Sequence, residues 1–145
     1  MDPDSLNTPK TSLTYTLYVV FLRVVAVACL WFSLQYWAML VGLSLHGQGR
    51  FDLLSLPWRA AASSLAVVFP VAALGLWMAS SWGPVIWMIG AGAQILMYGF
   101  WSDMFGSNNL VMPMHGLIAV VYGLFRLALW LEKRHRDETI RVDLP

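Results

Sequence analysis

Charged residues and cysteine are both scarce in this 145-residue chain. Only 12% of the residues are Asp, Glu, Lys or Arg, roughly half the share of a soluble domain. Nine basic and eight acidic residues leave a formal net charge of +1, which argues against a basic nucleic-acid-binding surface and against an acidic tail. The single cysteine, Cys29, excludes an internal disulfide and a cysteine-rich metal site.

The short motifs of common catalytic and nucleotide-binding sites are also missing. The sequence contains no GxxxxGK[ST] phosphate loop, no HExxH, no CxxC pair and no nucleophile elbow. Gly90-Ala91-Gly92 lies within an apolar run and is interpreted as a helix-packing surface. We therefore predict a protein with no catalytic residues, no metal and no cofactor.

Hydrophobic residues make up 59% of the chain and are concentrated in four long runs. A membrane-spanning helix needs about 20 mainly apolar residues, so the runs predict helices over residues 18–45, 57–79, 84–101 and 110–131. Pro57 and Pro84 suit the first turn of a helix, and Pro70 is expected to kink the second one. We expect one all-α membrane domain, a four-helix transmembrane bundle with antiparallel neighbours, a polar N-terminus (1–12) and a charged tail (132–145).

Lys and Arg are distributed unequally between the two ends of these helices. Cytoplasmic loops of membrane proteins carry an excess of basic residues. If both termini are cytoplasmic, that side holds Lys10, Lys133, Arg134, Arg136 and Arg141, and the opposite side holds only Arg50 and Arg59. The bias predicts that both termini lie in the cytoplasm.

Polar side chains within the predicted helices are few, and they form two stripes. His115, Tyr122 and Arg126 share one face of the fourth helix by their spacing, and Gln94 and Tyr98 share one face of the third. We expect these stripes to face each other inside the bundle, with Gln35 of the first helix as a further candidate. The simplest interpretation is interhelical hydrogen bonding, and the alternative is a path for a ligand or an ion.

Two further pairs of residues are candidate sites. His115 could ligate haem together with His46, but His46 lies in a glycine-rich loop rather than on a helix, which makes a rigid axial pair unfavourable. Arg59 and Asp103 are predicted at the outer interface, where they could pair with each other or contact headgroups and water.

Several segments resemble an uncharacterised family of small four-helix inner-membrane proteins from alphaproteobacteria, a domain of unknown function. They are Phe21-Leu22-Arg23, Arg50-Phe51-Asp52-Leu53, Phe69-Pro70, Ser81-Trp82-Gly83-Pro84-Val85-Ile86-Trp87, and the stretch from Phe125 to Lys133. The resemblance covers most of the chain, from the first helix to Lys133. It implies the four-helix architecture and a bacterial inner membrane, and it assigns no chemistry to any residue.

From these observations we expect a non-enzymatic accessory, assembly or scaffold protein. Its predicted partners are the lipid bilayer and another membrane protein or a second copy of itself, without nucleic acid. One alternative is a small oligomeric transporter or channel lined by His115, Gln94, Tyr98 and Tyr122. Another is a membrane anchor that binds haem or quinone.

Overall fold

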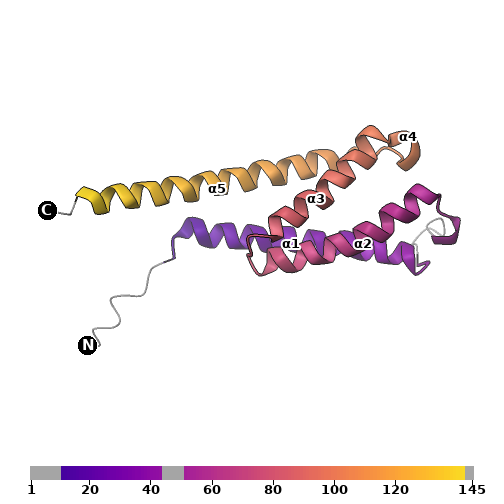
Figure 1. The fold of residues 1–145 in the computed structure, drawn as a ribbon, viewed down its shortest axis with the longest axis horizontal. Helices are drawn as coiled ribbons and strands as arrows, with labels where there is room; N and C mark the ends of the chain where they lie inside the picture. The colour runs from indigo at the N-terminus through magenta and orange to yellow at the C-terminus, as the bar shows by residue number, and fades with distance from the viewer. Residues whose placement is uncertain (1–10, 44–50, 143–145) are drawn as a thin grey trace, which may run out of the picture.

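The computed structural model describes residues 11–43 and 51–142, and the regular structure within these ranges is entirely helical (Figure 1). The long helices are α1 (Leu13–Leu40), α2 (Leu56–Trp77), α3 (Gly83–Ile95) and α5 (Val111–Val142). Shorter elements are the 3-10 turn η2 (Phe51–Leu53), the π-helical turn η3 (Leu96–Phe100) that continues α3, and α4 (Ser102–Phe105). The predicted all-α class is confirmed.

Four of the described helices are long and apolar enough to cross a membrane: α1, α2, α5, and α3 together with η3. This number agrees with the sequence prediction and is compatible with an integral membrane protein. The observed helix bounds differ from the predicted ones at both ends of the chain. α1 begins at Leu13 because Ser12 caps it, its hydroxyl accepting a hydrogen bond from the Tyr15 N–H at 3.2 Å. α1 ends at Leu40, and the expected end at residue 45 lies outside the described residues. α5 continues through the charged segment to Val142.

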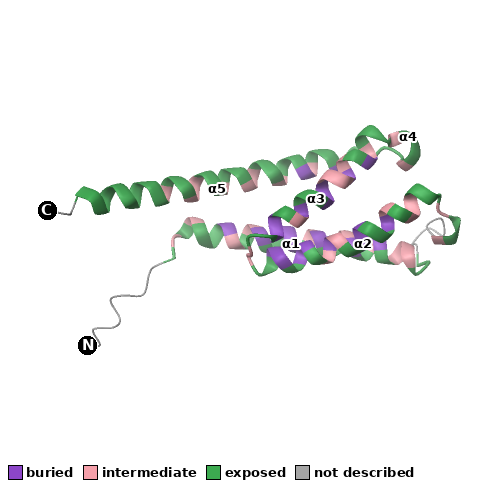
Figure 2. Cartoon of the chain, viewed as in Figure 1, coloured by how far each residue is buried: buried purple, intermediate pink, exposed green. Residues whose placement is uncertain are grey.

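The core lies between α1, α2 and α3, and the contact between α1 and α2 is the most extensive (Figure 2). α1 buries a stripe of side chains at intervals of three or four residues, namely Tyr18, Leu22, Val25, Ala26, Cys29, Ser33 and Tyr36. α2 meets it with small residues on either side of the fully buried Phe69. Small side chains let two helix backbones approach closely, which explains why these two helices form the tightest pair.

α2 continues without a break through Pro70. Proline has no N–H, so the carbonyl of Ala66, four residues earlier, loses its intrahelical partner. The indole Nε1–H of Trp37 on α1 donates to this carbonyl at 3.1 Å. A side chain from the neighbouring helix therefore satisfies the group that the proline leaves free, as membrane helices require.

The turn between α2 and α3 brings the two helices into very close contact. The N–H of Ser80 donates to the Gly75 carbonyl at 3.0 Å, which closes the end of α2 with Ala79 in the left-handed region at φ 51°. A Cβ on Gly83 would lie 2.4 Å from the carbonyl carbon of Gly75. Only glycine fits this crossing, so Gly83 allows α3 to pack directly on α2.

α5 is packed much less than the other helices (Figure 2). Only 6% of its most apolar stretch is buried, against 33–39% for the other three spans. Its inward side chains contact the first half of α1, where the rings of Tyr122 and Phe125 lie 6.2 and 6.1 Å from that of Tyr18. Beyond these rings, the Thr14 hydroxyl donates to the Glu132 carboxylate. The opposite face of α5 is exposed along its length.

Candidate functional site

Three polar side chains from three helices meet in the interior of the protein. Tyr36 of α1, Gln94 of α3 and His115 of α5 are 3%, 1% and 2% exposed. The Gln94 amide Nε2 donates to the Tyr36 hydroxyl at 2.8 Å, and its Oε1 lies 2.6 Å from Nε2 of His115. We call Tyr36, Gln94 and His115 the polar cluster. It links the three helices by hydrogen bonds between side chains.

The hydrogen bonds of the polar cluster define the tautomer of His115. Because the amide nitrogen of Gln94 donates to Tyr36, its oxygen faces the imidazole and accepts, so Nε2 of His115 carries the hydrogen. Nδ1 is then an acceptor, and it is buried with no hydrogen-bond partner among residues 11–43 and 51–142. The rings of Phe32 and Trp87 flank the imidazole, with centroids 6.1 and 5.9 Å from it.

The chemistry available to the polar cluster is limited by its surroundings. Among residues 11–43 and 51–142, no three His, Cys, Asp or Glu side chains are grouped closely enough to hold a metal ion. His46, the second ligand of the considered haem site, lies outside the described residues. What the cluster does provide is interhelical hydrogen bonding between side chains that are buried in the interior.

The structure brings together Gln94 and His115, one residue from each of the two predicted stripes. Their partner from the first helix is Tyr36, whereas the sequence interpretation selected the adjacent Gln35, which is only half-buried. Tyr36 continues the spacing of the buried α1 stripe after Ser33, and Gln35 does not, but this stripe is identified by the packing of α1 and not by its sequence.

The third-helix stripe does not continue in register beyond Gln94, because α3 passes into the π-helical turn η3. In η3 the Trp101 N–H donates to the Leu96 carbonyl at 3.1 Å, and the wider turn rotates the following side chains. Met97 is therefore buried and Trp101 is 52% exposed. Tyr98 is half-buried, with its ring 6.5 Å from that of Trp58 and its hydroxyl within interaction range of Tyr36.

The other predicted residues lie outside the polar cluster. Tyr122 is half-buried against Tyr18 of α1, and Arg126 is exposed. Arg59 donates from Nε to the Leu54 carbonyl at 3.0 Å and from Nη2 to the Asp52 carbonyl at 2.7 Å. These bonds hold η2 against the start of α2. The structure gives no ion pair between Arg59 and Asp103, which is exposed on α4.

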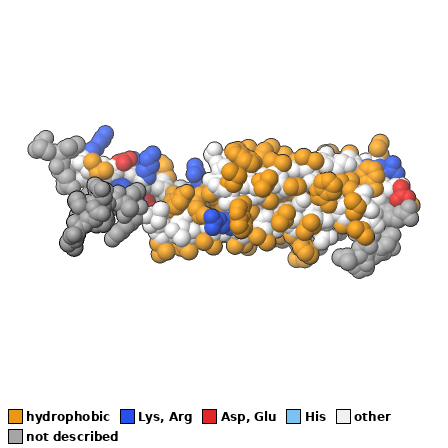
Figure 3. Space-filling view, turned by 90° about the horizontal axis from the view of Figure 1, so that it is seen from below, with side chains coloured by type: hydrophobic (Ala, Val, Ile, Leu, Met, Phe, Trp, Pro, Cys, Tyr) orange, Lys and Arg blue, Asp and Glu red, His pale blue; other side chains and the backbone are white. Residues whose placement is uncertain are grey.

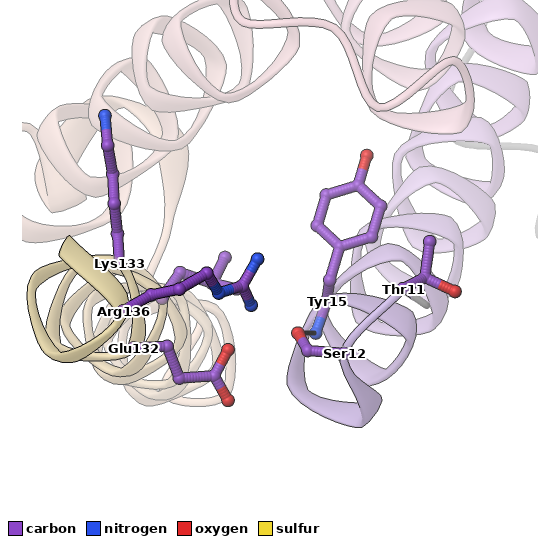
Figure 4. A pocket seen from close by; sticks show the side chains of 7 residues that line it. Thr11, Ser12, Tyr15, Glu132, Lys133 and Arg136 are labelled. Carbon is purple, nitrogen blue, oxygen red and sulfur yellow. Dashed lines mark hydrogen bonds between the residues drawn. The ribbon is translucent and has the colours of Figure 1, made fainter. Parts of the chain in front are cut away.

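A second polar feature lies between the start of α1 and the charged part of α5. It is a hollow of about 340 Å³ lined by Thr11, Ser12, Tyr15, Leu129, Glu132, Lys133 and Arg136. Arg136 extends from α5 toward α1 across this hollow (Figure 4). Side chains of both charge signs thus line the hollow, and the bond from Thr14 to Glu132 joins the two helices there.

Comparison with known proteins identifies a family but no function. No curated protein and no solved structure matches the chain. The model of a family of unknown function, DUF6163, matches residues 16–133. This range runs from the first turns of α1 to the charged part of α5 and contains the whole polar cluster, and it confirms the resemblance to an uncharacterised family. The chain belongs to the family of unknown function DUF6163.

Proposed function

We propose that this chain is a non-enzymatic accessory, assembly or scaffold protein that binds another membrane protein through α5. The observation that carries the proposal is the exposure of α5, whose apolar stretch is 6% buried although its mean hydropathy lies within the range of the other spans. A helix that contributes so little to the fold of its own chain has most of its surface available for a neighbour.

The exposed face of α5 has a shape that suits helix packing. Gly116 and Gly123 lie two helical turns apart on that face, and nothing lies within 4 Å of where a Cβ would stand on either. The intervening and following side chains, Val120 and Leu127, are 61% and 52% exposed. Glycine at this spacing allows close approach of a second helix in a membrane, where packing rather than water exclusion drives association.

The polar cluster supports this proposal over transport. Tyr36, Gln94 and His115 bond to one another inside one chain, whereas a pore between copies would need such groups at the surface. They therefore act as interhelical contacts that position α5 on α1 and α3.

We further propose a bacterial inner-membrane location with both termini in the cytoplasm and antiparallel neighbouring helices. The start of α1 and the end of α5 lie at the same end of the molecule, which supports a common side for both (Figure 1). In a Cys29→Ala background, Arg134→Cys should react with a membrane-impermeant maleimide only after the inner side is opened. Leu110→Cys, at the opposite end of α5, should react from outside. The reverse pattern would contradict this orientation.

The docking proposal is tested by gentle solubilisation of tagged protein from native membranes, followed by quantitative mass spectrometry. We expect one membrane protein in stoichiometric amount with the wild type, and its loss with Gly123→Leu. Gly92→Leu on α3 is the matched control, because a Cβ at Gly92 also meets nothing within 4 Å. Recovery of a monomer without a partner would refute the proposal. Recovery of a defined homo-oligomer would instead favour the alternative function of a small oligomeric transporter or channel. A Soret band or a bound quinone would favour the other alternative, a membrane anchor that binds haem or quinone.

A further inference from the structure

The pair of helices α1 and α2 carries an apolar groove on its surface. The groove has a volume of about 460 Å³ and is lined by Ala26, Val27, Leu30, Pro70, Ala73, Leu74 and Trp77. Its floor is low because Ala26 and Ala73, which are 3% and 8% exposed, have only a methyl group. Its walls are exposed larger side chains such as Val27 and Leu74. The volume is within the range of small-ligand sites, about 300–1,000 Å³.

A cation without a protein acceptor stands beside one end of this groove. Arg23 precedes Ala26 by one turn of α1, and its guanidinium carbon lies 5.5 Å from the ring centroid of Trp77. This contact with an aromatic ring is its one interaction in the part of the chain that the structure describes. The N–H groups of the guanidinium, about five in number, therefore remain without an acceptor there.

Arg23 lies at the height along the helices at which lipid headgroups are expected. Trp77 is the last residue of α2, whose 22 residues give a length of about 33 Å, close to the hydrocarbon thickness of a bilayer. Tryptophan at the end of a spanning helix is typical of the membrane–water interface. Hydrophobic side chains cover most of the face seen in Figure 3, with a few Lys or Arg side chains among them. An exposed guanidinium at the edge of such a surface is well placed to bind an anionic headgroup.

We infer that Arg23, Trp77 and the α1–α2 groove bind one phospholipid, with its phosphate on Arg23 and an acyl chain along the groove. A guanidinium donates two parallel hydrogen bonds to phosphate oxygens. The groove runs from Trp77 toward Leu30 and Pro70 and is apolar throughout, which matches an acyl chain that leaves the headgroup at Arg23. This site is separate from the exposed face of α5 and does not depend on the proposed partner.

Native mass spectrometry of the delipidated protein in detergent tests the phosphate contact. The probes are dioleoyl phosphatidylglycerol and dioleoylglycerol, which has the same chains and no phosphate. The wild type should bind one phosphatidylglycerol in preference to the diacylglycerol. Arg23→Gln should weaken phosphatidylglycerol binding by about tenfold or more, the loss expected for a charge-assisted hydrogen bond, and leave the diacylglycerol unchanged. Arg126→Gln, an exposed arginine outside the groove, is the control and should behave as the wild type.

A matched pair of valines tests the groove. Val27 lines it and Val24 does not, and both are exposed on α1, by 58% and 63%. Val27→Phe should weaken the binding of both lipids by filling the groove, whereas Val24→Phe should change neither. Both substitutions lie at the surface, and unchanged circular dichroism would show that they fold. Wild-type phosphatidylglycerol binding by Arg23→Gln, or equal effects of the two valine variants, would overturn the inference.

Discussion

We predict that the hydrogen bond from Trp37 to the Ala66 carbonyl stabilises the protein because Pro70 leaves this carbonyl without a partner in its own helix. Trp37→Phe removes the indole N–H and keeps an aromatic ring, so the Ala66 carbonyl would lose its partner in a position that is 1% exposed. A buried polar group without a partner costs about 1–3 kcal/mol, while interhelical hydrogen bonds in membranes average about 0.6 and reach about 1.7 kcal/mol. We expect the free energy of unfolding to fall by about 1 kcal/mol, a value at which the two ranges overlap.

A double-mutant cycle tests whether the cost of losing the Trp37 indole N–H depends on Pro70. Pro70→Ala restores a backbone N–H that can donate to the Ala66 carbonyl, so the indole is no longer needed. Trp37→Phe should then cost only the difference in packing between the two rings. The coupling between the two substitutions should therefore be about 1 kcal/mol.

Reversible unfolding in mixed dodecyl maltoside and SDS micelles, followed by far-ultraviolet circular dichroism, measures each corner of the cycle. Trp31→Phe is the control, because Trp31 is 61% exposed on the same helix and has no comparable bond. Its cost should be the same with Pro70 or Ala at position 70. If the Trp37 coupling is within about 0.3 kcal/mol of zero, as for independent sites, the proposed link between the proline and the indole is wrong.

Five other substitutions have expected outcomes in the same unfolding assay. Gln94→Leu should lower the free energy of unfolding by about 1–3 kcal/mol because it removes both hydrogen bonds of the buried amide. Tyr36→Phe removes only the bond from Gln94 and should cost less. Equal costs would contradict the bridging role of the amide. Gly83→Ala should lose about 1–3 kcal/mol by overpacking, whereas Gly92→Ala, where a Cβ meets open space, should be neutral or stabilising. Ala79→Gly should gain up to about 1 kcal/mol by relieving the left-handed backbone, and a loss would show that this residue is unstrained.

Much of the architecture could be predicted from the sequence. The number of spans follows from the length and apolarity of the runs, which do not depend on how the helices pack. The helix starts predicted at Pro57 and Pro84 are within one residue of the observed ones, because proline is tolerated in the first turn of a helix. Gln94 and His115 could be recognised because a polar group within a spanning helix needs a partner and few others were available.

The rotation of each helix about its axis could not be predicted in the same way. In a soluble helix the polar face identifies the outside, but here exposed Val24 and Leu30 are as apolar as buried Leu22 and Val25. The spacing of apolar residues along α1 therefore does not predict which side of the helix faces α2. The choice of Tyr36 over the adjacent glutamine followed only from the packed structure.

By itself the sequence determined that this is a four-helix apolar protein with a small set of internal polar groups, because length, composition and proline position act locally. The tertiary structure decided which of those groups meet, since the π-helical turn η3 changed the register after Gln94 and the close crossing at Gly83 set α3 against α2. It also decided that α5 stays exposed while α1 and α2 pair closely. Such contacts depend on the fit between helices far apart in the chain, and no local pattern encodes that fit.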